Sequence, residues 1–143
     1  MPHIKTRLAA VLLSVAFAGG AISAAHADDA PDYKKHVKDG KDDKTIAHGY
    51  NFYGDNCLRC HGPDGSGSSY APNLTNSLKT MSYDTFTQTV INGRKNVSTT
   101  SDSVMPAFGE VADVVNNLDS IYMYLKARSD GALGRGRPKR FDD

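Results

Sequence analysis

Hydrophobic residues follow helical spacing most clearly near the C-terminal end of the chain, over residues 113–128. They recur there at spacings of one, three and four, which places them on one face of a helix. These residues are Val114, Val115, Leu118, Ile121, Tyr122 and Leu125. No run shows convincing period-two alternation. The pattern therefore predicts a mostly α protein.

Two further segments show helix boundaries and buried stripes. We expect Thr45 to cap a helix over residues 46–57, and Ser82, a residue type favoured at the N-cap, to begin a second helix that ends at Gly93. The expected buried positions are Ile46, Tyr50, Phe52 and Tyr53 in the first helix, and Phe86, Val90 and Ile91 in the second. The sequence thus predicts three main helices joined by loops.

The two cysteines of the chain occur together, at the end of the first predicted helix. Cys57 and Cys60 are followed by His61, and this C-x-x-C-H pattern is typical of c-type haem attachment. Thiols three positions apart face the same way, so each can form a thioether with one haem vinyl group. His61 is then the proximal iron ligand. We predict one covalently attached haem c, with the helices and loops folded around it.

Three other uses of a cysteine pair are weaker. A structural zinc site needs four ligands, and no second Cys pair or H-x-x-x-H completes the set. A thioredoxin-like dithiol follows an apolar strand, whereas residues 50–56 are polar and aromatic. A disulfide around two residues stabilises little, and it leaves His61 unexplained.

The N-terminal 27 residues have the features of a secretory signal peptide. Lys5 and Arg7 precede an apolar run over 8–18, and the small-x-small sequence at 25–27 suits cleavage before Asp28. The run is shorter than the ~20 residues of a membrane span, so an uncleaved anchor is the weaker alternative. We expect export to the periplasm and no membrane insertion after cleavage.

Charge divides the remaining chain into a central domain and two charged ends. Loss of residues 1–27 removes two basic and no acidic residues from a chain of formal charge +1. The resulting slightly negative chain has no overall basic field for nucleic acid. We expect a flexible charged arm over 28–44, a haem domain over 45–128 and a basic tail over 129–143. The tail is interpreted as a solvated end, with a docking patch as the alternative.

Met105 is the candidate for the sixth iron ligand. It lies in a loop beside Pro106, whereas Met123 falls on the third predicted helix and Met81 just before the second. A lone methionine often fills a gap in a core. If Met105 does so, the iron is left with an open position, and the protein becomes a haem sensor or peroxidase. The loop over 62–74, rich in Gly, Ser and Pro, is expected to wrap one haem edge.

The motifs at 45–128 occur in an order that resembles class I monohaem cytochromes c. They are Gly49-x-x-x-Tyr53, Cys57-x-x-Cys60-His61, Pro72-Asn73-Leu74, Met105-Pro106-x-Phe108 and a terminal helix with Tyr122 and Leu125. The resemblance implies the small cytochrome c fold, in which Gly49 lets the first and last helices approach. It also implies that the Pro72 carbonyl accepts a hydrogen bond from His61, and that the protein transfers electrons rather than acting as an enzyme.

Residues 124–138 are similar to the endings of small cytochromes linked to PQQ-dependent alcohol dehydrogenases. These resemble the cytochrome c-L type acceptors of periplasmic methanol oxidation, including those paired with lanthanide-dependent enzymes, although this chain is shorter than many such partners. The resemblance implies a quinoprotein methanol or alcohol dehydrogenase as the donor, and a cytochrome or an oxidase as the acceptor. A respiratory shuttle unrelated to alcohol oxidation is the alternative.

Overall fold

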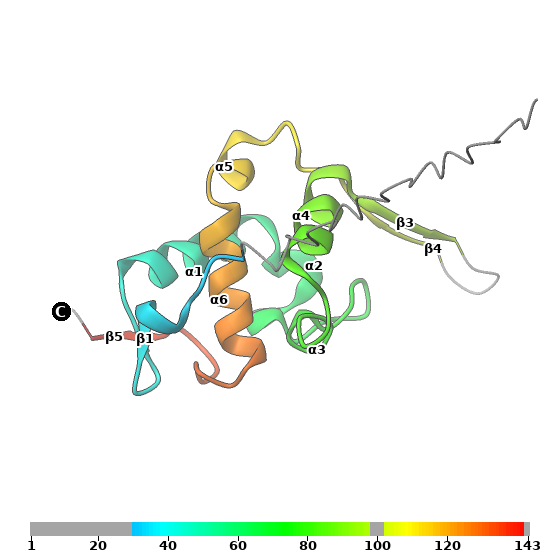
Figure 1. Ribbon diagram of the computed structural model, residues 1–143. Helices are drawn as coiled ribbons and strands as arrows, with labels where there is room; N and C mark the ends of the chain where they lie inside the picture. The colour runs from blue at the N-terminus through cyan, green and yellow to red at the C-terminus, as the bar shows by residue number, and fades with distance from the viewer. Residues whose placement is uncertain (1–29, 98–101, 142–143) are drawn as a thin grey trace, which may run out of the picture.

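The computed structural model describes residues 30–97 and 102–141 as a small, mostly helical domain (Figure 1). The helices are η1 Lys34–His36, α1 Lys44–Asn56, α2 Leu58–His61, η2 Pro63–Gly65, α3 Leu74–Ser77, α4 Tyr83–Asn92, α5 Ala112–Val115 and α6 Leu118–Ser129. The strands are β1 Val37–Lys38, β2 Lys41–Asp42, β3 Arg94–Val97, β4 Asp102–Met105 and β5 Lys139–Arg140. The mostly α class predicted from the sequence is confirmed.

The crossing of α1 with α6 forms the centre of the fold (Figure 1). Gly49 lies at the crossing point, where a Cβ atom would come 1.9 Å from the carbonyl oxygen of Ser120. A residue larger than glycine therefore does not fit without separating the helices. The close approach expected at Gly49 is present.

Helix α1 begins two residues earlier than predicted. The N-cap is Asp43 rather than Thr45, and its carboxylate accepts hydrogen bonds from the backbone N–H groups of Thr45 and Ile46. Asp is as good an N-cap as Thr, and its charge suits the positive end of the helix dipole. Helix α4 has the predicted boundaries, with Ser82 accepting from the Thr85 N–H and Gly93 ending the helix.

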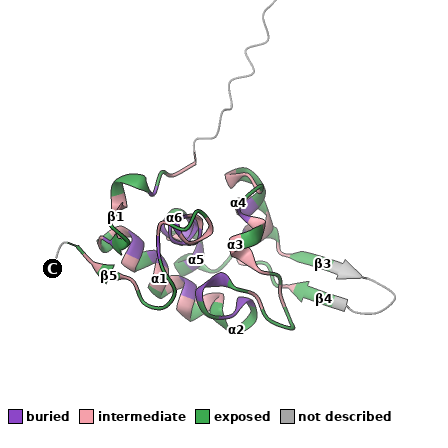
Figure 2. Cartoon of the chain, turned by 90° about the horizontal axis from the view of Figure 1, so that it is seen from below, coloured by how far each residue is buried: buried purple, intermediate pink, exposed green. Residues whose placement is uncertain are grey.

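The third predicted helix is broken into α5 and α6. The chain leaves helical geometry at Asn117, whose side-chain amide donates to the Asp113 carbonyl 2.7 Å away. Asparagine side chains compete for backbone groups in this way, which disfavours them inside helices. Beyond the break, α6 is buried around most of its circumference (Figure 2), because several helices pack around it.

The two charged ends are not irregular, as the sequence analysis expected, but pair with each other. Strand β2 pairs antiparallel with β1 and parallel with β5, with Lys41 opposite Lys139 and Asp42 opposite Arg140. Before β5, Leu133 is 3 % exposed within the core. Charge density predicted solvation, but backbone pairing and one apolar anchor hold these segments to the domain.

Strands β3 and β4 form an antiparallel hairpin that projects from one side of the domain (Figure 1). Its register places Arg94 opposite Met105, at the base of the hairpin. These strands were not expected from the sequence, because the segment has no alternating apolar face. Within the described residues, no helix is long and apolar enough to cross a membrane.

Candidate haem site

The two cysteines lie where α1 ends and the short helix α2 follows it. The backbone N–H of Cys57 still donates to Tyr53 in α1, and the N–H groups of Cys60 and His61 donate to the Cys57 carbonyl. Both thiols are free, with Cys57 half-buried and Cys60 exposed. Burial, with a smaller contribution from nearby Cys60, raises the pKa of the Cys57 thiol to about 11.

His61 is buried, and its ring is oriented by a backbone acceptor. Its Nδ1 lies 3.1 Å from the carbonyl oxygen of Pro72. Because a carbonyl only accepts hydrogen bonds, Nδ1 must carry the proton, and Nε2 is left with a free lone pair. The backbone of His61 is held as well, since its carbonyl accepts from the Gly67 N–H at 2.7 Å. The imidazole is therefore set up to bind a metal through Nε2.

The loop after His61 closes on itself so tightly that two positions require glycine. Gly62 has φ +71°, and a Cβ there would lie 2.4 Å from the Gly67 carbonyl oxygen. Gly67 has φ +85°, and a Cβ there would lie 2.8 Å from the Asn73 nitrogen. We call residues 62–67 the proximal loop. It returns the chain from His61 toward the segment that supplies the Pro72 carbonyl.

Tyr53 holds the proximal loop against α1, a role that the sequence analysis missed. Its hydroxyl donates to the Gly62 carbonyl at 2.5 Å and accepts from the Gly65 N–H at 3.0 Å. The side chain is 1 % exposed, and this burial raises the pKa of the Tyr53 hydroxyl to about 12. The sequence identified Tyr53 as a buried position of a helix and as part of the Gly49-x-x-x-Tyr53 motif, but not as a hydrogen-bond partner of the loop.

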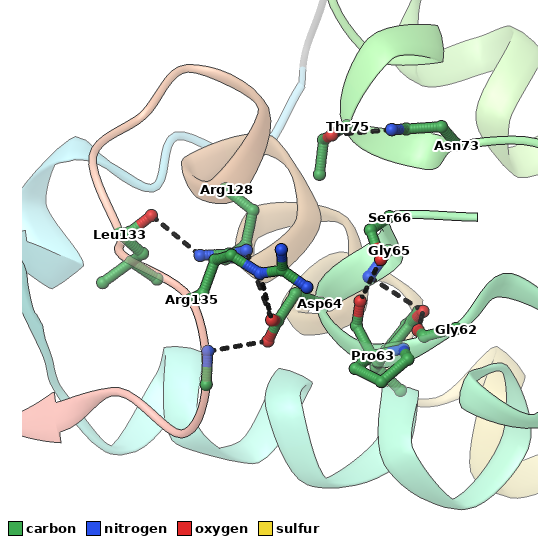
Figure 3. Close-up of polar contacts among 12 residues, drawn as sticks. Gly62, Pro63, Asp64, Gly65, Ser66, Asn73, Thr75, Arg128, Leu133 and Arg135 are labelled. Carbon is green, nitrogen blue, oxygen red and sulfur yellow. Dashed lines mark hydrogen bonds and ion pairs between the residues drawn. The ribbon is translucent and has the colours of Figure 1, made fainter. Parts of the chain in front are cut away.

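Asp64, also missed from the sequence, is a buried carboxylate within the proximal loop (Figure 3). It accepts from the backbone N–H of Gly136 at 3.0 Å and from Arg135 Nε at 3.4 Å, and Arg128 Nη2 lies 3.6 Å away. Its φ of +61° is left-handed, a conformation that Asp and Asn tolerate better than most residues. The Asp64-Gly65 pair after a proline is a turn signal, but it does not indicate this partner.

Met105 ends strand β4 at the base of the hairpin and is half-buried against the core. The backbone approaches Gly93 closely there, because a Cβ at Gly93 would lie 2.6 Å from the Met105 carbonyl oxygen. The backbone atoms of Pro106 and Ala107 also lie close to Gly93. The hairpin base thus lies against the end of α4, and Met105 ends a strand rather than lying in the proline-containing loop expected from the sequence.

These donor groups fit a covalently bound haem better than another metal site. The two thiols are unpaired, with Cys57 at the N-cap of α2 and Cys60 within it, beside a histidine with one free ring nitrogen. Across residues 30–97 and 102–141, no three His, Cys, Asp or Glu side chains cluster in a way that could hold a metal ion. A zinc site lacks ligands in this part of the chain.

Comparison with known proteins agrees with a haem site formed by the two cysteines and His61. Residues 44–125 match the protein family described as cytochrome C oxidase, cbb3-type, subunit III. Cytochrome c-553I of Paracoccus denitrificans is 44 % identical over 117 residues, which cover 82 % of this chain and 51 % of that protein. Cytochrome c-555 of Methylococcus capsulatus is 34 % identical over 137 residues, 95 % of each chain.

Among solved structures, the c-type cytochrome XoxG from Methylobacterium extorquens AM1 matches with a TM-score of 0.63 and 43 % identity. The match covers 70 % of this chain and 60 % of that one. The chain thus spans about half the length of the Paracoccus relative and all but a small part of the Methylococcus one. The chain belongs to the c-type cytochromes, a family of electron-transfer proteins that bind haem c covalently.

Proposed function

We propose that this protein carries single electrons through one haem c, attached at Cys57 and Cys60 and ligated by His61 and Met105. The observation that carries the proposal is the His61 ring, held by the Pro72 carbonyl next to two free thiols. A bound haem c supplies an iron that alternates between its ferric and ferrous states. Two axial ligands from the protein suit electron transfer rather than binding of small molecules.

The protein groups contribute in different ways. The Pro72 carbonyl keeps the proton on Nδ1 of His61, fixes the ring orientation and raises the basicity of Nε2. Met105, with a thioether and no proton to lose, is a ligand that raises the reduction potential. Its backbone is fixed by the contact with Gly93 and by pairing with Arg94. The sixth position would therefore be filled by a residue on a rigid hairpin base.

We infer that the donor is a PQQ-dependent methanol or alcohol dehydrogenase, and that a cytochrome or an oxidase accepts the electron. The support is the resemblance of residues 124–138 to cytochromes of that class, together with the match to the c-type cytochrome XoxG. Most of that segment lies in α6 and the tail, which the structure holds to the domain. We expect the donor to make a small, transient contact with this protein, as is usual between electron-transfer partners.

The axial ligand is tested by replacing Met105 with leucine. We expect Met105→Leu to abolish the far-red Met-to-iron charge-transfer band of the ferric protein and to permit CO binding to the ferrous protein. Met81→Leu is the matched control, since Met81 is also half-buried but lies before α4, and it should leave both spectra unchanged. A Met105→Leu spectrum identical to that of the unaltered protein would contradict the proposed ligand.

The donor is tested by stopped-flow mixing of the haem-loaded protein with a substrate-reduced quinoprotein dehydrogenase. We expect haem reduction at micromolar concentrations, and faster reduction than by a respiratory donor such as a quinol-oxidising complex. Reduction only by the respiratory donor would identify the protein as a shuttle unrelated to alcohol oxidation.

We also propose that the protein works in the periplasm after loss of residues 1–27, which lie outside the described residues. Mass spectrometry of the protein from a periplasmic extract should give a mature chain that begins at Asp28 and carries the mass of one haem. A full-length chain recovered from the membrane fraction would contradict cleavage, and a mass of two haems would contradict the single attachment site.

A further inference from the structure

Residues 131–141 follow α6 and run back across the domain, and they contact it at several places. The backbone N–H groups of Ala132 and Leu133 donate to the Ala127 carbonyl, and the Leu133 side chain is buried. Gly136 and Arg135 reach Asp64 in the proximal loop, and β5 then pairs with β2. We call this segment the C-terminal strap.

The contact with Asp64 joins the strap to the loop that carries His61 (Figure 3). The Gly136 N–H and Arg135 Nε bind different oxygens of the same carboxylate. Arg128, whose side chain is 7 % exposed, lies on the α6 side and also donates to the Leu133 carbonyl at 3.0 Å. The carboxylate is thus surrounded by one backbone N–H from the strap and two guanidinium groups.

The proximal loop connects this contact to both the backbone carbonyl and the side-chain ring of His61. Tyr53 binds the loop at Gly62 and Gly65, the residues on either side of the Pro63-Asp64 pair. The Gly67 N–H donates to the His61 carbonyl, and Gly67 also packs against Asn73. Asn73 directly follows Pro72, whose carbonyl accepts from His61 Nδ1. A shift of Asp64 would therefore alter both the loop and the placement of the Pro72 carbonyl.

We propose that Asp64, held by Arg135 and Gly136 of the strap, is a positioning residue for the axial His61. The inference rests on the proposed role of His61 as an iron ligand. The strap fixes the proximal loop, and the loop keeps the Nδ1 hydrogen bond to Pro72 short and aligned. A looser bond makes Nε2 a weaker ligand, stabilises the ferric state less and raises the reduction potential.

The sign of the potential change separates positioning from a simple charge effect. Removing the negative charge in Asp64→Asn raises the potential by either route, since the ferric state is the more positive one. Removing the positive charge in Arg135→Gln lowers the potential if charge alone acts, but raises it if the loop loosens. Arg135→Gln is thus the decisive variant, and its side chain is 77 % exposed, so the fold should tolerate the change.

Arg137→Gln is the matched control. It removes the same charge two residues away in the strap, where Arg137 lies over the Tyr50 ring at 5.6 Å. Midpoint potentials of the three haem-loaded variants should rise in Asp64→Asn and Arg135→Gln and stay level or fall slightly in Arg137→Gln. Equal changes in the two arginine variants, or a fall in Arg135→Gln, would overturn the proposal.

Hydrogen exchange gives a second measurement that does not depend on the potential. In the ferrous protein, the Gly67 N–H and the His61 Nδ1–H should exchange about tenfold faster in Arg135→Gln than in Arg137→Gln, through local opening of the loop. Unchanged exchange at both protons would reject a role for the strap. If the unaltered protein shows no c-type haem spectrum, the proposed function fails instead, and this outcome is seen before any variant is made.

Discussion

Gly49 on α1 and Ser120 on α6 lie so close that a Cβ atom at Gly49 would be 1.9 Å from the Ser120 carbonyl oxygen. The two backbones can meet there because Gly49 has no side chain. The angle and distance between the two helices therefore depend on the absence of a Cβ atom at Gly49. The same holds for the position of Cys57, the C-cap residue of α1.

Gly49→Ala should therefore destabilise the protein by about 2 kcal/mol or more, since the backbone of Ser120 cannot move aside without displacing α6. Gly54→Ala in the same helix has nothing within 4 Å of its Cβ and should be neutral or stabilising by up to about 1 kcal/mol. Urea unfolding of the haem-loaded proteins measures both. Equal stability of the two variants would show that the helices separate freely.

Asp43 has two partners, and a pair of substitutions separates them. Its Oδ1 caps α1, and its Oδ2 lies 2.6 Å from His36 Nδ1. Asp43→Ala should cost about 1 kcal/mol because the cap is lost. Asp43→Asn keeps a capping oxygen and should cost less, and both are measured by urea unfolding. The interpretation of Asp43 as the N-cap would be wrong if alanine were tolerated as well as asparagine.

Tyr53→Phe should destabilise the protein by about 1–3 kcal/mol, because it leaves a buried carbonyl and a buried N–H of the proximal loop without their partner. Thermal unfolding at neutral pH checks this value. Tyr70→Phe is the control, since Tyr70 is 78 % exposed. A loss as large in Tyr70→Phe would mean that the Tyr53 hydroxyl is not a special contact.

The same hydroxyl predicts how stability changes in alkali. Burial raises the pKa of Tyr53, Tyr33 and Tyr83 from 10.0 to about 12, with Asp130 and Asp119 adding to the rise at the latter two. The folded protein therefore holds these protons more tightly than the unfolded chain. Their contribution is complete below pH 10 and is lost as the pH rises toward 12.

Urea midpoints between pH 9 and pH 12 should accordingly fall, and the fall should be smaller in Tyr53→Phe than in Tyr70→Phe. The difference between the two variants isolates Tyr53 from lysine titration, which both share. Parallel pH curves for the two variants would contradict the raised pKa of Tyr53.

The C-terminal strap should contribute to stability mainly through Leu133. This side chain is 3 % exposed, so Leu133→Ala should cost about 2–5 kcal/mol by leaving a cavity. Phe141 lies at the end of the strap and is 39 % exposed, so Phe141→Ala should lower the free energy of unfolding by only about 0.5 kcal/mol. Calorimetry on the two haem-loaded variants tests this order. A larger loss at Phe141 would mean that the strap is held by its end.

Local signals predicted α4 completely, because Ser82, the apolar stripe and Gly93 all lie within one short segment. They failed for the third helix, where the side chain of Asn117 binds the backbone and separates α5 from α6. They also missed the N-cap of α1 by two residues. Residue types that can form an N-cap are common, and both Asp43 and Thr45 are of this kind. Which of them caps the helix depends on the direction in which the chain enters it.

The candidate site divides in the same way. Cys57, Cys60 and His61 are contiguous, so the chemistry of haem attachment could be predicted from sequence alone. Asp64 is separated from Arg135 and Gly136 by more than half of the described residues, and no spacing rule connects them. Charge density in the tail indicated solvation, whereas the fold places one of its arginines on a buried carboxylate.

The sequence by itself determined the attachment motif and the helical class, because each depends on covalent spacing or on neighbours along the chain. The roles of Gly49 at the helix crossing and of the Pro72 carbonyl were expected only from the resemblance to class I cytochromes c. The tertiary structure decided that the two charged ends pair through β2 and β5, and that Asp64 receives the C-terminal strap. These contacts join residues far apart in sequence. Only packing of the helices brings them within hydrogen-bond distance, so no local pattern records them.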